Sequence, residues 1–410
     1  MFEIIPIFNA MWRQKSHAIL LMLQIALTLA IVANAAFIIQ NRLDLMNRDS
    51  GIPESEVFKV DVFSFGNDAN NVLQAQLDQQ ALRAIPGVVD AVRINQIPIS
   101  GSSDNSSFSD SADREKALVI TAGVYRGDNH MINTFGAKLI EGRNFNEDEI
   151  NTGNSNEPVA VAIVSKAFIE RMFPLTEAEK KQGKSQQGLG KNIFAADVPI
   201  KIIGILDKLQ GSNVNTSWVD SAIILPKVQT NNFARYLVRT NASERQSIMH
   251  KIEKLMLELY PSRVIMKPIT MDEVRDSSYQ NDRLMSQLLS ILIVILLLVT
   301  ALGIVGMAIF NVNRRTRQIG TRRALGASKA NVIRYFIVEN WIISTVGIAF
   351  GVILTLFLNQ FLMEQFSLPK LDYSYIVNTV IGIWLLGIFA VYLPARKASN
   401  ISPAIATRSV

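Results

Sequence analysis

The chain has 410 residues, of which 49% are hydrophobic and only 19% are charged. Soluble domains carry roughly 25% charged residues, so this composition favours a membrane protein over a soluble one. The chain contains no cysteine, which excludes disulfide bonds and thiolate metal sites. Its histidines, His17, His130 and His250, lie far apart in the sequence and offer little material for a metal site or a catalytic triad.

Residues 1–17 precede the first long apolar stretch and mix apolar side chains with Trp12, Arg13 and Lys15. This mixture is typical of a short helix that lies along the cytoplasmic interface of a membrane. The alternative is that these residues extend the first membrane span as a frayed helix. We assign residues 1–40 to an interfacial helix and the first transmembrane helix, with that alternative left open.

Long uncharged stretches occur at four places in the chain: 18–40, 284–310, 340–363 and 374–394. A helix needs about 20 apolar residues to cross the hydrocarbon core of a bilayer, so each stretch predicts one transmembrane helix. The first stretch is longer than the apolar region of a signal peptide, which has about 7–15 residues. We therefore interpret it as a retained anchor.

The segment 41–283 has 243 residues, too many for a loop between two spans. Its hydrophobic pattern alternates between the periods of strands and helices, which indicates a mixed α+β domain of two or more small lobes. Strands are expected at 56–65, 89–99, 117–125, 159–165, 198–206, 233–240 and 263–269, and helices at 71–85, 129–136, 166–173 and 243–259. The serine-rich stretch 100–116 is expected to be a mobile loop, and 175–192 a polar surface insertion.

Two fragments of this domain, 183–185 and 190–192, resemble pieces of a phosphate-binding loop. A Walker A motif needs Gly-x-x-x-x-Gly-Lys-Ser/Thr, and Ala178 and Asn192 stand where the motif requires other residues. The acidic run 147–149 lacks the ligand spacing of a calcium loop. The sequence therefore predicts no nucleotide site, metal site or catalytic constellation in this chain.

Basic residues are concentrated in the short segments outside the spans. The loop 311–335 carries seven of them, whereas 41–283 holds 28 basic and 31 acidic residues. Lys and Arg collect in short cytoplasmic loops, so we expect both termini and the loop 311–335 in the cytoplasm and 41–283 outside. Nucleic-acid binding is a poor alternative, because no aromatic platform or binding fold accompanies the arginines.

The stretch 311–348 resembles the signature of FtsX-like permeases of ABC transporters, and reads NVNRRTRQIGTRRALGASKANVIRYFIVENWIISTVGI. The approach to the second span, 268–307, and the ending PARKASNISPAIATR are similar to the same family. Three stretches of the inserted domain, 135–149, 159–174 and 200–206, resemble the periplasmic core domain of MacB-type permeases. The resemblance implies a membrane α-helical fold with four transmembrane helices, a large inserted extracytoplasmic α+β domain and a helical stalk formed by 41–48 and 271–283.

The resemblance also implies that the loop 311–335 contains a coupling helix that contacts an ATPase. The matching residues are Ile319, Gly320, Arg322, Arg323, Ala324, Leu325, Gly326 and Ala327, with Glu339 at the start of the third span. Gln318 departs from the pattern, because the family commonly has Glu there. The alternative is that the arginines serve only topology and lipid headgroups.

Local signals suggest a structure for this loop. Residues 311–318 can prolong the second span, Gly320 permits a break, and Thr321–Leu325 can form a short helix. Gly326 suits the position just after a helix end, where a left-handed conformation is common. Ser328 can cap the helix that becomes the third span.

MacB itself carries an ATPase fused before its first span, whereas 17 residues precede the first apolar stretch here. We therefore expect ATP to be bound by a separate cytoplasmic ABC ATPase, with no cofactor in this chain. The resemblance implies a second permease chain, identical or sibling, and a periplasmic adaptor and outer-membrane channel as further partners.

The expected location is the inner membrane of a bacterium, with 41–283 in the periplasm and 284–410 forming an FtsX-like domain. The expected role is to pass ATP-driven motion to the periplasmic domain for export of a peptide, antibiotic or similar compound. The uncharged stretches offer no charged pathway and Glu339 lies at the cytoplasmic edge of the third, which suits mechanical transmission better than ion-coupled transport. The alternatives are lipoprotein extraction and FtsX-like signalling that controls a cell-wall hydrolase.

Overall fold

The computed structural model describes residues 15–65, 71–102, 104–113, 115–153, 157–182, 186–366 and 369–401. The described residues up to Asp44 and from Asn281 onward form one compact unit, and Leu45–Gln280 form another. We call them the helical unit and the inserted domain. The interfacial helix predicted for 1–17 falls mostly on residues outside the described ranges.

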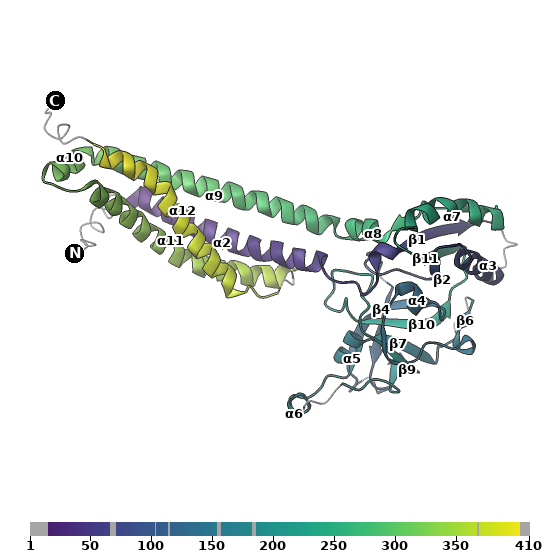
Figure 1. The fold of residues 1–410 in the computed structure, drawn as a ribbon. Coiled ribbons are helices and arrows are strands. Elements are labelled where there is room, and N and C mark those ends of the chain that lie inside the picture. Colours follow the sequence, from purple (N-terminus) through teal and green to yellow (C-terminus); the bar gives the residue numbers. More distant parts are fainter. Residues whose placement is uncertain are drawn as a thin grey trace. The chain divides into compact units, whose positions relative to one another are not determined.

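Long apolar helices form the helical unit, and they run beside one another in Figure 1. They are α2 (Lys15–Met46), α9 (Gln280–Arg314), α11 (Lys329–Phe366) and α12 (Tyr373–Ser399). In the described part of the chain, these four helices are long and apolar enough to cross a membrane. The four predicted spans are therefore confirmed.

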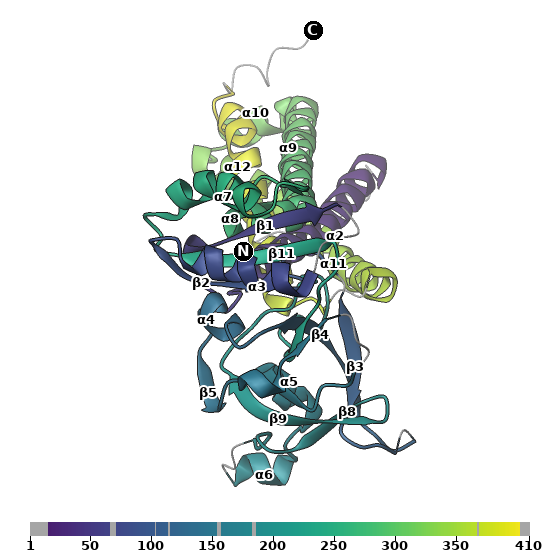
Figure 2. The ribbon, with the colours of Figure 1, turned by 90° about the vertical axis from the view of Figure 1, so that its right-hand side faces the viewer.

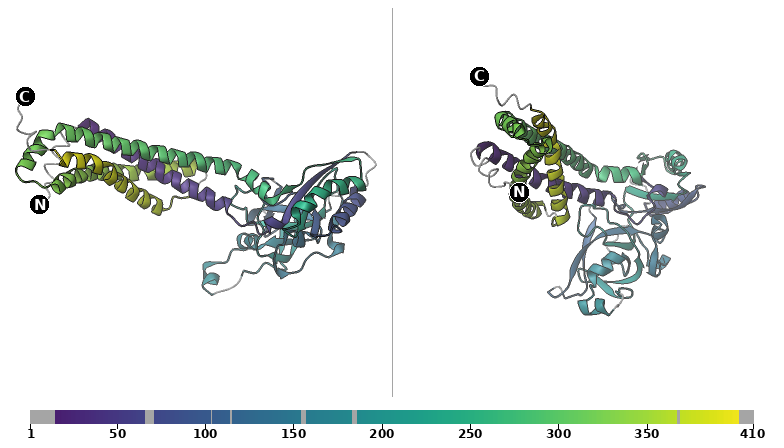
Figure 3. Two further views of the ribbon diagram at one scale, coloured as in Figure 1. Left: turned by 45° about the horizontal axis from the view of Figure 1, so that its top comes forward. Right: turned by 60° about the vertical axis from the view of Figure 1, so that its left-hand side comes forward.

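Helix α2 packs against both α9 and α11, which lie close to it in Figure 3. The hydroxyl groups of Thr28 in α2 and Thr300 in α9 are 2.8 Å apart and both residues are buried. On the other side, a Cβ placed on Gly347 would lie 2.9 Å from the carbonyl oxygen of Met22. Glycine at this position lets the backbones of α2 and α11 approach closely, which is a common device in membrane helix packing.

Helices α2 and α9 both continue past their uncharged stretches. Arg42 of α2 pairs with Asp282 of α9, with Nη1 and Oδ1 3.0 Å apart. This pair joins the two helices beyond the apolar region, where ionised side chains cost less than in the hydrocarbon core.

The first lobe of the inserted domain is an antiparallel sheet with strand order β12-β1-β11-β2, and β13 also pairs with β1. Helices α3 and α7 share one hydrophobic core with this sheet, in which Phe58 and Tyr236 are fully buried. The bounds of these elements are β1 Val57–Ser64, α3 Asn71–Arg83, β2 Val88–Arg93, β11 Phe233–Thr240, α7 Arg245–Leu259, β12 Arg263–Ile265 and β13 Ile269–Thr270.

The second lobe is a sheet that closes on itself (Figure 2). Its strands pair in the order β4-β3-β8-β9-β7-β10, and β10 pairs back with β4, which completes the ring. The edges β5 and β6 pair with β9 and β10, and α5 packs on the same core. The bounds are β3 Asn105–Ser109, β4 Val119–Gly127, β5 Leu139–Gly142, β6 Asn151–Thr152, β7 Val161–Ser165, α5 Lys166–Met172, β8 Asn192–Ala195, β9 Val198–Leu206 and β10 Ala222–Val228.

A further hydrophobic core lies where the two lobes of the inserted domain meet. Helix α4 (Met131–Phe135) contributes Met131 and Phe135, which are fully buried together with residues of both sheets. The helix ends at Gly136, as predicted, with a positive φ of 61°. The remaining elements are η1 Glu54–Glu56, η2 Glu147–Glu149, α6 Glu177–Lys181 and α8 Met271–Ser278.

The prediction of a loop at 100–116 is wrong. The stretch 100–116 is not simply a loop, because it contains β3, which pairs with β4 along its length and buries Phe108. The polar insertion 175–192 contains α6 and the first residue of β8. In β3, backbone hydrogen bonds to β4 override a polar local sequence.

Candidate functional site

The connection between α9 and α11 contains a separate short helix, α10 (Thr316–Ala324). The break before it occurs at Arg315, which has φ −104° and ψ 13°. The predicted break at Gly320 is therefore wrong, and so is the predicted helix start at Thr321. Gly320 is buried inside α10, whereas Arg315 directs its side chain to α11.

The end of α10 has the geometry of a Schellman motif. Gly326 has φ 95°, its N–H donates to the carbonyl of Arg323 at 3.2 Å, and the N–H of Ala327 donates to the carbonyl of Arg322 at 3.0 Å. Ser328 then accepts a hydrogen bond from the N–H of Asn331 at 3.2 Å. The predicted helix-ending role of Gly326 and capping role of Ser328 are confirmed.

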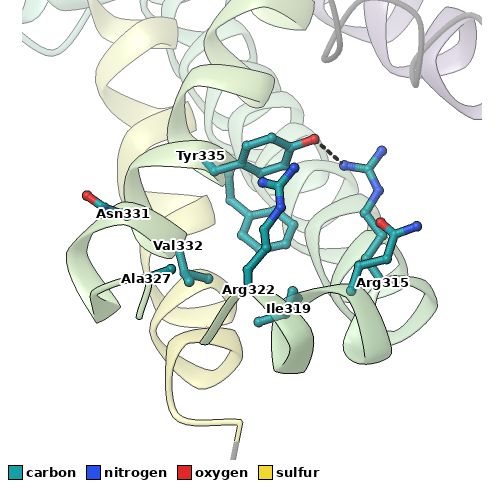
Figure 4. A pocket seen from close by; sticks show the side chains of 9 residues that line it. Arg315, Ile319, Arg322, Ala327, Asn331, Val332 and Tyr335 are labelled. Atoms are coloured by element: carbon teal, nitrogen blue, oxygen red, sulfur yellow. Dashed lines mark hydrogen bonds between the residues drawn. The ribbon is translucent and has the colours of Figure 1, made fainter. Parts of the chain in front are cut away.

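Arg315 connects this break to α11 through two hydrogen bonds. Its Nη1 donates to the hydroxyl of Tyr335 at 2.9 Å and to Oε2 of Glu339 at 3.1 Å. Figure 4 shows Arg315 at the hydroxyl end of Tyr335 and Arg322 beside its ring, and the guanidinium of Arg322 is 5.3 Å from the ring centre. A cation at this distance from an aromatic face is attracted by the ring quadrupole.

A pocket of about 100 Å³ lies between α10 and the start of α11 (Figure 4). Gln318, the residue that departs from the family pattern, is one of the side chains around it. The others are Arg315, Ile319, Arg322, Ala327, Asn331, Val332, Tyr335 and Phe336. Nothing in the structure explains why glutamine stands at position 318.

The predicted coupling residues fall into two groups. Ile319 and Gly320 are buried and Ile319 packs in the same core as Val332 and Phe336, so they hold α10 against the bundle. Leu325 is 83% exposed. Arg322, Ala324 and Gly326 are also exposed, and Arg323 and Ala327 are half-buried.

Glu339, predicted at the start of the third span, is only 3% exposed. Its partner Arg315 and the intervening Tyr335 were not among the predicted site residues. Tyr335 could have been found from its position four residues before Glu339, which places both side chains on one face of α11. Arg315 has no comparable local signal, because its partners lie 20 and 24 residues away.

Two family models match the chain. The FtsX-like permease C-terminal model matches residues 290–403, and the MacB-like periplasmic core domain model matches residues 18–262. The second match alone covers more than half of the chain.

Curated relatives agree with these models. The macrolide export ATP-binding/permease protein MacB 2 of Aeromonas hydrophila subsp. hydrophila is 28% identical over 283 residues, 65% of this chain and 40% of that protein. The pyoverdine export ATP-binding/permease protein PvdT of Pseudomonas savastanoi pv. phaseolicola is 24% identical over 294 residues, 69% of this chain and 42% of that protein. The chain thus spans less than half of the length of the curated relatives it matches.

Among solved structures, the periplasmic region of MacB from Actinobacillus actinomycetemcomitans is similar to 57% of this chain and 97% of that chain. The TM-score is 0.33 and the sequence identity 13%. The spans and the family models together describe an inner-membrane protein with a periplasmic domain. The chain belongs to the family of ABC-transporter permeases that combine a MacB-like periplasmic core domain with an FtsX-like C-terminal domain.

Proposed function

We propose that this chain is the membrane subunit of an ABC exporter and that it passes motion from a separate cytoplasmic ATPase to its periplasmic domain. The observation that carries the proposal is Leu325, a large apolar side chain that is 83% exposed at the end of α10. An exposed leucine among arginines suits the centre of a small protein interface, with charged residues at its rim. The groove of an ATPase subunit is the proposed partner surface.

The packing of α10 supports a mechanical role. Ile319 anchors the helix in the bundle, and Arg315 ties its beginning to α11 through Glu339. A push on Leu325 would therefore move α9 and α11 with α10 rather than bend a loose loop.

The orientation belongs to the same proposal. The basic loop and both termini lie in the cytoplasm, and the inserted domain, assigned to 41–283, lies in the periplasm. A second permease chain, identical or sibling, completes the transporter in the membrane. The exposed apolar side chains of α9, such as Leu288 at 67% and Leu302 at 69%, support a lipid or helix neighbour on that face.

The exported compound is proposed to be a peptide, antibiotic or similar molecule, in line with relatives named for macrolide and pyoverdine export. An adaptor protein and an outer-membrane channel would complete the route out of the cell. ATP would be bound by the partner ATPase.

Replacing Leu325 with Asp tests the coupling contact. The tagged chain is purified in mild detergent from its native host, and the ABC ATPase that accompanies it is quantified by mass spectrometry. Leu325→Asp should lower the recovered ATPase by about tenfold or more, because it places a charge in a desolvated apolar contact. Ala330→Asp is the matched control, because Ala330 is also exposed but lies on α11 rather than at the end of α10, and this variant should retain the ATPase. Equal recovery from wild type and Leu325→Asp would refute the coupling assignment.

A further inference from the structure

A small pocket in the inserted domain is lined by arginine. Its volume is about 100 Å³, and three of the described residues around it are arginines while none is acidic. The lining residues are Arg93, Ile94, Asn95, Arg126, Gln229, Asn231, Phe233 and Arg235. We call it the arginine pocket. Arg93 and Arg235 come from the first lobe and Arg126 from β4 of the second, so the pocket lies between the two lobes.

Arg93 differs from the other two arginines in its deeper burial. It is 5% exposed, and its Nη2 donates to the carbonyl oxygens of Asn231 at 2.7 Å and Phe233 at 3.3 Å. No carboxylate in the described part of the chain pairs with it. A buried guanidinium without an anionic partner is costly unless something else supplies the negative charge.

The other two arginines each bind one carboxylate through only some of their nitrogen atoms. Arg235 uses Nε and Nη2 to bind Asp61 at 2.7 and 3.1 Å, and Arg126 uses Nη1 to bind Asp104. Asp61 also pairs with Lys59 at 2.6 Å. This group of side chains therefore contains four cations and two carboxylates, a net positive charge.

Hydrogen-bond donors remain unused around the pocket. Nε and Nη1 of Arg93, Nε and Nη2 of Arg126 and Nη1 of Arg235 make no hydrogen bond to any residue that the structure describes. The N–H groups of an arginine form a planar fork that matches the oxygen spacing of carboxylate and phosphate groups. The volume is well below the roughly 300–1,000 Å³ of pockets that hold drug-sized ligands, but it exceeds that of a single water molecule.

We infer that the arginine pocket binds one oxyanion group, a carboxylate or a phosphate, of a soluble periplasmic solute. The bound group would accept hydrogen bonds from Arg93 and Arg235 of the first lobe and from Arg126 of the second. It would thereby link the two lobes of the inserted domain. The inference is independent of the proposed coupling to an ATPase.

The test uses the full chain purified in detergent, with sodium phosphate and sodium acetate as probes and sodium chloride at equal ionic strength as the reference. Isothermal titration calorimetry and the midpoint of thermal unfolding are the two readouts. Saturable binding of phosphate or acetate, with a higher midpoint than in chloride, is expected. If neither probe exceeds chloride, the inference is overturned.

Three variants locate the binding. Gln229→Glu places a carboxylate at the half-buried lining position without removing an arginine, so it should occupy the unused donors itself and weaken binding about tenfold or more. Arg126→Gln should weaken it similarly. Arg143→Gln removes an arginine that pairs with Glu149 outside the pocket and should bind as wild type does. If Arg126→Gln fails to fold, Gln229→Glu still decides, and wild-type affinity in that variant would refute the site.

Discussion

Arg315 donates a hydrogen bond from Nη1 to Oε2 of Glu339 at 3.1 Å, which joins the residue that separates α9 from α10 to the N-terminal third of α11. The two side chains are only 11% and 4% exposed. Two charges are tolerated in such surroundings because each is the other's partner. The relationship predicts that the effects of removing the two partners are not additive.

Glu339→Gln and Arg315→Gln should each lower the free energy of unfolding by about 3 kcal/mol, since each leaves a buried charge uncompensated. The double variant should lose clearly less than the sum of the two. Denaturant unfolding of the chain in detergent micelles measures all three. Arg317→Gln, at an exposed position on α10, is the control for the loss of a basic residue. Additive single effects would show that the pair is not coupled.

The parts of this site that the sequence could predict are those set by local backbone chemistry. Gly326 and Ser328 carry their roles in their own residue types, because a left-handed residue and a helix cap need only near neighbours. The contact of Arg315 with Glu339 depends instead on how α9 and α11 pack, and 24 residues separate the partners. The break predicted at Gly320 is wrong because a glycine is compatible both with a helix break and with a position inside a helix.

The strands of the inserted domain also fall into those that the local sequence predicts and those that depend on pairing with other strands. Strands with a clear apolar pattern, such as β1 and β9, were predicted close to their observed bounds. Strand β10 was missed because Pro226 interrupts an otherwise apolar run, and proline usually argues against a paired strand. Strand β3 was missed because its serines carry little hydrophobic pattern, and only its pairing with β4 makes it a strand.

Gly347→Ala should destabilise the helical unit. A Cβ there would lie 2.9 Å from the carbonyl oxygen of Met22 and 3.1 Å from Cβ of Ile25, so α2 and α11 would have to move apart. Overpacking of this kind costs about 1–3 kcal/mol. Gly306→Ala in α9 is the matched control, because a Cβ there meets nothing within 4 Å. Thermal unfolding in micelles should show a lower midpoint for the first variant only, and equal midpoints would contradict the packing.

The pair of Asp61 and Arg235 predicts an acid-dependent loss of stability in the inserted domain. Burial raises the pKa of Asp61, but hydrogen bonds and charge from Arg235 and Lys59 outweigh burial, and the net result is a lowered pKa. Because the folded-state pKa lies below the unfolded value of about 3.9, the pair stabilises the fold above that pH. The stabilisation is lost as the pH falls below about 4 and through the folded-state pKa.

Asp61→Asn removes this contribution at every pH. The difference in unfolding free energy between wild type and Asp61→Asn should therefore be largest near neutral pH and shrink below about pH 4. Urea unfolding between pH 3 and pH 7 measures it, and Asp148→Asn, an exposed position, controls for the loss of one carboxylate. A difference that does not change with pH would show that Asp61 contributes through packing rather than charge.

Cysteine labelling tests the orientation of the chain in the membrane. Because residues 1–410 contain no cysteine, a single introduced cysteine is the one thiol in this sequence, and labelling of the purified chain reports on that position. Ser107 in β3 and Ala330 in the first turn of α11 are both exposed. With the basic loop in the cytoplasm, Ser107→Cys should react with a membrane-impermeant maleimide in intact spheroplasts. Ala330→Cys should react only after the membrane is permeabilised, and its labelling in intact spheroplasts would place the loop, and with it the proposed ATPase contact, on the wrong side.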